Sequence, residues 1–148
     1  MRSERASLLP LTSDLLLLAM LLYVALGSAI GGVSRYLLGG LVQRMLDTTF
    51  PAGTLLVNVT GSFLLGAIIR YALETPSLTP EVRAFLTIGV CGGYTTFSTF
   101  SYETMALLED GEWARAGVYI TASVILSLIA TFTGFALARQ VIVWREHL

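Results

Sequence analysis

Four long apolar stretches, joined by short polar connections, constrain the fold of this chain more than any other feature. A helix needs about 20 mostly apolar residues to cross the roughly 30 Å hydrocarbon layer of a bilayer. The stretches cover about residues 15–41, 53–73, 82–108 and 113–143, after a polar N-terminal extension at residues 1–14. Because the connections leave no room for a soluble domain, the sequence predicts a single all-α integral membrane domain with four transmembrane helices.

The composition supports a membrane protein and argues against several other classes. Of the 148 residues, 55% are hydrophobic and 13% are charged, whereas a soluble domain carries about 25% charged residues. Nine basic and ten acidic side chains leave no basic face for a nucleic acid. Cys91 and His147 are each the only residue of their type, so we expect no disulfide and no Cys/His metal site within one chain. We expect no enzyme, because the apolar stretches hold no Ser/His/Asp set.

The N-terminus and the arginines bear on how the chain inserts. The first apolar stretch is longer than the 7–15 residues of a signal-peptide core, so we expect no cleavage. With four spans, six arginines fall on the side of the termini and three on the other; the three are Arg35, Arg44 and Arg115. Several of the nine lie close to or inside helix ends, which weakens the bias that sets orientation. We therefore hypothesise insertion in both orientations.

The third stretch contains a candidate helix break at Gly92-Gly93-Tyr94-Thr95-Thr96. Each glycine costs a helix about 1 kcal/mol relative to alanine. Broken membrane helices occur where their backbone is buried in protein or lines a cavity, and their freed carbonyls commonly coordinate Na⁺. The alternative is that Gly92 and Gly93 only permit close helix packing. The two glycines alone favour neither the break nor close packing, but the hydroxyl residues that follow favour the break.

An aromatic pair and an amide offer uncharged contacts to an anion. Phe97 and Phe100 are three residues apart and share a helix face. The edge of a phenyl ring is electropositive, although ordinary packing is the commoner role of such a pair. Asn58 lies in an otherwise apolar stretch, where an amide is costly unless it is hydrogen-bonded. It either links helices or donates to an anion.

The fourth stretch carries a stripe of hydroxyls, and two charges complete the inventory. Tyr119, Ser123 and Ser127 are spaced by four residues, which places them on one helix face. Such hydroxyls alternatively bond to their own backbone carbonyls. Arg35, near the end of the first stretch, either faces a cavity or extends to the membrane interface. Glu103 either pairs with Arg35 or faces an aqueous mouth.

The segments at residues 53–62 and 92–101 resemble the bacterial fluoride channels of the Fluc (CrcB) family, and the similarity covers roughly Leu22 to the C-terminus. The resemblance implies an antiparallel, dual-topology homodimer in the bacterial inner membrane, with two pores that export fluoride passively. It implies a structural Na⁺ at the dimer centre, held by the backbone carbonyls of Gly92 and Thr95 of each subunit. The anion pathway that it implies comprises Asn58, Phe97, Phe100, Thr96, Ser98, Tyr119, Ser123, Ser127, Glu103 and Arg35. One subunit cannot easily enclose a pore and satisfy its own broken backbone, whereas two subunits can.

The main alternative is a small dual-topology multidrug exporter coupled to protons. Such exporters are similar in size but need a membrane-embedded acid in their first helix. This chain has no Asp or Glu between Asp14 and Asp47. We therefore expect a fluoride channel rather than a coupled transporter.

Overall fold

The computed structural model describes residues 2–75 and 78–146, with side chains described for 14–75 and 78–145. Within these ranges the chain forms only helices and short connections. The helices are α1 (Arg2–Leu46), α2 (Ala52–Glu74), α3 (Pro80–Ala84), the π-helix η1 (Phe85–Cys91), α4 (Gly92–Tyr94), α5 (Phe97–Glu109) and α6 (Trp113–Glu146). His147, the single histidine, lies outside the described residues.

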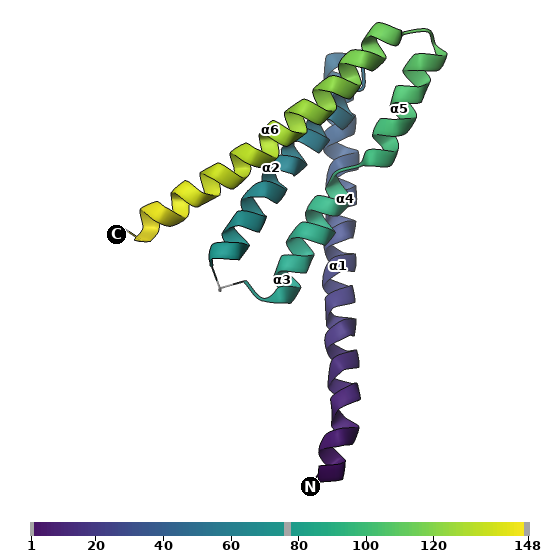
Figure 1. Cartoon of the computed structure of the whole chain (residues 1–148). Coiled ribbons are helices and arrows are strands. Elements are labelled where there is room, and N and C mark those ends of the chain that lie inside the picture. The colour runs from purple at the N-terminus through teal and green to yellow at the C-terminus, as the bar shows by residue number, and fades with distance from the viewer. Residues whose placement is uncertain (1, 76–77, 147–148) are drawn as a thin grey trace.

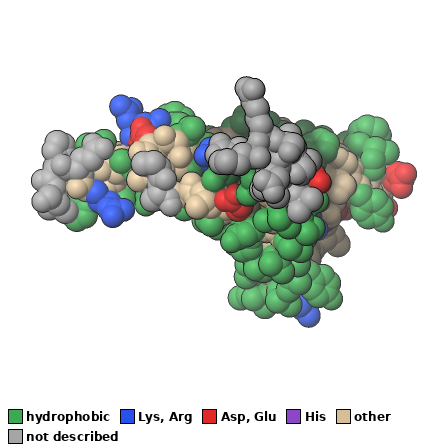
Figure 2. Space-filling model, turned by 90° about the horizontal axis from the view of Figure 1, so that it is seen from below, with side chains coloured by type: hydrophobic (Ala, Val, Ile, Leu, Met, Phe, Trp, Pro, Cys, Tyr) green, Lys and Arg blue, Asp and Glu red, His purple; other side chains and the backbone are tan. Residues whose placement is uncertain are grey.

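Three helices of the described chain are long and apolar enough to cross a bilayer: Asp14–Leu46, Ala52–Glu74 and Trp113–Arg145. Many of their large apolar side chains are exposed, and green hydrophobic groups gather in the lower part of the view in Figure 2. Exposed apolar surface of this extent is stable in lipid but not in water. The protein is therefore an all-helical, multi-pass membrane protein.

Helix α1 differs from the predicted 15–41 span. It begins at Arg2 and continues for 45 residues to Leu46, which corresponds to about 68 Å at the rise of an α-helix. Residues 2–14, predicted as a separate polar extension, continue the same helix, and α1 runs well past the start of α3 (Figure 1). The helix ends where Asp47 adopts a left-handed conformation with φ 43°, which Asp tolerates better than most residues.

Helices α2 and α6 lie side by side and run in the same direction (Figure 1). Glycines on both helices permit this approach. A Cβ added at Gly66 would lie 2.2 Å from the Thr131 carbonyl oxygen, and one at Gly134 would lie 2.1 Å from that of Phe63. Small residues allow membrane helices to gain van der Waals contact between backbones. This contact sets the distance between α2 and α6.

On the other side of the molecule, α1 packs against η1 and α4 (Figure 1). A Cβ added at Gly31 would lie 2.2 Å from the Val90 carbonyl oxygen, and one at Gly93 would lie 2.7 Å from that of Ser28. The first half of the third apolar stretch is thus held against α1 by direct backbone contact.

The backbone of the third stretch leaves the helix at Thr95 and Thr96, which are both extended, with φ/ψ of −80°/158° and −151°/122°. The interruption lies at the C-terminal end of the predicted segment 92–96, whereas Gly92 is helical, with φ −66° and ψ −37°, and both glycines lie within α4. Gly93 has the packing role of the alternative interpretation. Thr96 begins the next helix, since its hydroxyl accepts a hydrogen bond from the Thr99 N–H at 3.2 Å, as an N-cap does.

Candidate functional site

Asn58 holds the extended segment in place. Its Nδ2 donates to the Thr96 carbonyl at 3.0 Å, and its Oδ1 accepts from the Thr96 N–H at 2.8 Å. An α-helix would instead have bonded this N–H to the Gly92 carbonyl. The amide therefore replaces backbone partners that the interruption removes. Of the two roles expected for Asn58, the structure places it in the linking one, although one of its two N–H groups stays available.

Arg35 lies on the other side of the same segment. Its Nη1 donates to the Thr95 carbonyl at 3.2 Å, and the side chain is half-buried. The Thr95 N–H and hydroxyl both donate to the Cys91 carbonyl at 3.0 Å. The Arg35 guanidinium is thus directed at the backbone of the extended segment.

The backbone oxygens of Gly92 and Thr95 are suited in kind to a hard cation. The Gly92 carbonyl loses its helical donor because Thr96 bonds to Asn58. The Thr95 carbonyl accepts from Arg35 but has a second lone pair. Neutral carbonyl oxygens are the ligands that unwound membrane helices offer to Na⁺. The Gly92 and Thr95 carbonyls of one chain do not complete a coordination shell, which needs further ligands.

Glu103 is held by hydroxyls and does not pair with Arg35. Thr54 Oγ1 donates to its Oε1 at 2.8 Å, and the Tyr119 hydroxyl donates to its Oε2 at 2.7 Å. The ring of Tyr119 is fully buried against Phe50 and Phe100, with centroids 5.6 and 5.2 Å away. Both carboxylate oxygens accept, which fixes the orientation of the acid.

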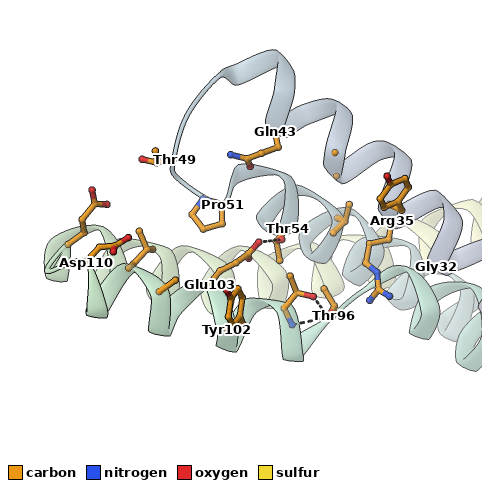
Figure 3. Close-up of a pocket in the computed structure, with 18 residues that line it drawn as sticks. Gly32, Arg35, Gln43, Thr49, Pro51, Thr54, Thr96, Tyr102, Glu103 and Asp110 are labelled. Carbon is orange, nitrogen blue, oxygen red and sulfur yellow. Dashed lines mark hydrogen bonds between the residues drawn. The ribbon is translucent and has the colours of Figure 1, made fainter.

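A cavity of about 620 Å³ extends between Arg35 and Glu103 (Figure 3). Arg35 and Glu103 both line it. Asp110 and Glu112 also line it, so the charged side chains of this cavity other than Arg35 are all acidic. Thr96 lines both this cavity and the next one. We call this space the charged cavity.

A second cavity, of about 390 Å³, is lined without any charged side chain among the residues that the structure describes. We call it the neutral cavity. Phe97 and Phe100 line it, with ring centroids 5.5 Å apart, and Phe97 is 78% exposed. Ser123 and Ser127 line it as well, and the Ser123 hydroxyl is buried without a hydrogen-bond partner. Hydroxyl donors and phenyl rings therefore share one uncharged space.

The remaining predicted residues lie around these cavities. Seven of the predicted residues line the neutral cavity: Asn58, Thr95, Thr96, Phe97, Phe100, Ser123 and Ser127. Tyr119 lines neither cavity and contributes through its bond to Glu103. The Ser98 hydroxyl lies 3.3 Å from that of Thr96, as part of the cap of α5. Gly92 is exposed and lines neither cavity.

Sequence reasoning missed two polar residues of α2. Thr54 binds Glu103, and Ser62 lines the neutral cavity. Both are spaced four residues from Asn58, so a search for polar side chains at helical spacing would have found them.

Comparison with known proteins places these features in a family. Residues 22–135 match the family described as CrcB-like protein, Camphor Resistance (CrcB). The chain belongs to the CrcB family. One relative is the fluoride-specific ion channel FluC of Geobacter sulfurreducens, which is 52% identical over 120 residues, covering 81% of this chain and 97% of the relative. The protein of the same name from Thermus thermophilus is 51% identical over 116 residues, covering 78% of this chain and 92% of the relative.

A third relative, the fluoride-specific ion channel FluC of Rhizobium meliloti, is 48% identical over 122 residues, or 82% of this chain and 98% of the relative. The CrcB match at residues 22–135 includes every residue of the candidate site, from Arg35 to Ser127. Residues 1–21 precede it, and α1 begins among them, at Arg2. The site therefore lies wholly within the part of the chain that the family shares.

Proposed function

We propose that this protein is a fluoride-selective channel that lets fluoride leave the cytoplasm passively, down its electrochemical gradient. The observation that carries the proposal is the neutral cavity, in which phenyl rings and unpaired hydroxyls meet without a fixed charge. Relatives that are about half identical over nearly their whole length bear the name of fluoride-specific ion channels. Since those relatives are ion channels, we assign no enzymatic activity.

An uncharged path suits conduction of a small anion. A channel site must bind an ion well enough to admit it and weakly enough to release it. Hydroxyls donate hydrogen bonds to an anion, and phenyl edges offer it a weak electropositive contact. A lysine or arginine within the neutral cavity would hold the anion too strongly. Arg35, in the charged cavity, attracts the anion before it enters the neutral cavity.

The channel is proposed to be an antiparallel homodimer. In it, α3, η1, α4 and α5 together form the third of four membrane crossings of each subunit. Phe97 is largely exposed in a single chain, and a second chain would cover it and close the neutral cavity into a pore. The weak arginine asymmetry is compatible with insertion in both orientations. The bacterial inner membrane is the proposed location.

A Na⁺ at the centre of the dimer is part of the proposal. The carbonyls of Gly92 and Thr95 from two copies would hold it, and its charge would compensate oxygens that the interruption deprives of helical donors. The ion would act as a structural link between subunits. No step of anion movement is assigned to it.

Fluoride efflux from liposomes tests the proposal. Purified protein is reconstituted in vesicles loaded with potassium fluoride or potassium chloride, and valinomycin is added to release the counter-charge. We expect rapid efflux of fluoride and almost none of chloride. Vesicles that retain fluoride, or release both anions equally, would reject the channel. Phe97→Ile and Phe100→Ile should each lower the fluoride rate strongly, while dimeric elution in detergent is kept.

A further inference from the structure

Two polar stripes face each other along α2 and α6. On α2 the stripe consists of Thr54, Asn58 and Ser62, and on α6 of Tyr119, Ser123 and Ser127, both with a spacing of four residues. This spacing places each set on one helix face. Thr54 and Tyr119 both bond to Glu103, while Asn58, Ser62, Ser123 and Ser127 all line the neutral cavity. The stripes therefore form three successive pairs along the two helices: Thr54 with Tyr119, Asn58 with Ser123, and Ser62 with Ser127.

The third pair lies next to the closest approach of the two helices. Gly66 follows Ser62 by four residues, and Thr131 follows Ser127 by four. A Cβ added at Gly66 would lie 2.2 Å from the Thr131 carbonyl oxygen, so the backbones touch one turn beyond the serine pair. Ser62 and Ser127 thus lie where the space between α2 and α6 closes, on the far side of Asn58 from Glu103.

The three pairs differ in how far their hydrogen bonds are satisfied. In the first pair both hydroxyls donate to Glu103, and in the second the Asn58 amide bonds to Thr96. In the third pair, neither Ser62 nor Ser127 has a side-chain hydrogen bond within the described chain. Other helical hydroxyls bond to carbonyls of their own helix: those of Thr60, Ser101, Thr104, Thr131 and Thr133. The serine pair thus retains free donors.

We propose that Ser62 and Ser127 form a two-hydroxyl binding site for a small, hard anion at the inner end of the neutral cavity. This site deepens the proposed fluoride path and rests on it. Two O–H groups can converge on one anion, and the neighbouring Ser123 hydroxyl, buried without a partner, adds a third donor. A cation is disfavoured because no carboxylate of the described chain lines this cavity, in contrast to the charged cavity. Ser62 is the new member of the path, since it lies on the helix opposite the predicted hydroxyl stripe.

Hydroxyl removal tests the site. Liposome efflux and its dependence on internal fluoride concentration are measured for Ser62→Ala, Ser127→Ala, the double variant and Ser62→Thr. Each single alanine variant should lower the rate by about tenfold, the size of one hydrogen bond to a charged acceptor, and raise the fluoride concentration for half-maximal flux. The double variant should be slower than either single one, because a single remaining hydroxyl still donates to the ion whereas the double variant offers it neither. Ser62→Thr keeps a hydroxyl and should conduct at close to the original rate.

Ser101→Ala is the matched control. Its hydroxyl bonds to the Phe97 carbonyl at 2.9 Å and lines neither cavity, so this variant should conduct normally. A wild-type rate in Ser62→Ala would overturn the serine site while leaving the channel intact. If wild-type protein itself releases no fluoride, the proposed function fails instead. Should Ser62→Ala not elute as the native dimer, Ser62→Cys replaces it, because a thiol is a poor donor of similar size; a wild-type rate in that variant likewise overturns the site.

Discussion

The two halves of the third apolar stretch are held in place by different forces. Before the interruption, η1 and α4 lie against α1 through glycines whose backbones touch it, such as Gly93. After the interruption, α5 is positioned by hydrogen bonds, from Asn58 to Thr96 and from Thr54 and Tyr119 to Glu103. Close packing tolerates no added atom, whereas hydrogen bonds can be lost one at a time. The first half thus acts as a scaffold, and the second half presents the polar groups and the exposed Phe97.

The largest effect is expected from a methyl group in the scaffold half. In Gly31→Ala the new Cβ would lie 2.2 Å from the Val90 carbonyl oxygen, so α1 and η1 must separate. We expect a loss of about 3 kcal/mol in the free energy of unfolding, the upper range of overpacking. Far-UV circular dichroism during titration with a denaturing detergent measures it. Gly117→Ala is the control, because nothing lies within 4 Å of its added Cβ; equal unfolding of the two variants would remove the distinction between the halves.

The next effect comes from the amide that fixes the extended segment. Asn58→Ala leaves both the Thr96 N–H and its carbonyl without the partner seen here. Each unsatisfied group costs about 1–3 kcal/mol, so we expect a loss of about 2 kcal/mol in stability and nearly complete loss of fluoride efflux. Thr60→Val, on the same helix, removes a hydroxyl that contacts the Leu56 carbonyl and the Tyr94 hydroxyl but not the extended segment, and it should conduct. Full efflux through Asn58→Ala would show that the segment holds its shape without the amide.

Removing the charge of Arg35 should change the affinity of the proposed Na⁺ site. Its guanidinium bonds to the Thr95 carbonyl, which the proposed Na⁺ also uses, so the two positive charges repel each other. Arg35→Gln should lower the Na⁺ concentration needed for half of the thermal stabilisation by about tenfold, the effect of a repulsion slightly above 1 kcal/mol. The melting temperature is measured as choline is replaced by Na⁺, with Arg35→Lys as the charge-conserving control. A melting temperature that is independent of Na⁺ in every variant would contradict the proposed ion.

The smallest effect is expected where one acceptor has two donors. Thr54→Val leaves Glu103 bonded to Tyr119, and Tyr119→Phe leaves it bonded to Thr54. Each change should cost about 1 kcal/mol, the net value of one hydrogen bond. The double variant should lose more than the sum, because the acid then has neither hydroxyl. Strict additivity in the same detergent titration would show that the two donors act independently.

The sequence predicted those features that depend on local pattern. The second and fourth apolar stretches were expected at 53–73 and 113–143, and α2 and α6 cover Ala52–Glu74 and Trp113–Glu146. Apolar length alone determines such helices, because the bilayer requires internal hydrogen bonding. The stripe of Tyr119, Ser123 and Ser127 followed from spacing for the same reason.

Features that depend on contacts distant in sequence could not be predicted. The sequence predicted a break within residues 92–96 but not its exact position. Gly93 contacts Ser28 of α1 and stays helical. The break lies at Thr95 and Thr96, where Asn58, 38 residues away, supplies replacement partners. Glu103 was expected either to pair with Arg35 or to face a mouth, and its hydroxyl partners became visible only in three dimensions.

The proposed selectivity is tested most directly by the reversal potential of the reconstituted channel. Protein in a planar bilayer is placed between solutions with opposite gradients of fluoride and chloride, and the voltage at zero current is recorded. The account predicts a reversal potential at the equilibrium potential of fluoride, with negligible dependence on chloride. A reversal potential that follows chloride, or that lies midway between the two anions, would contradict it.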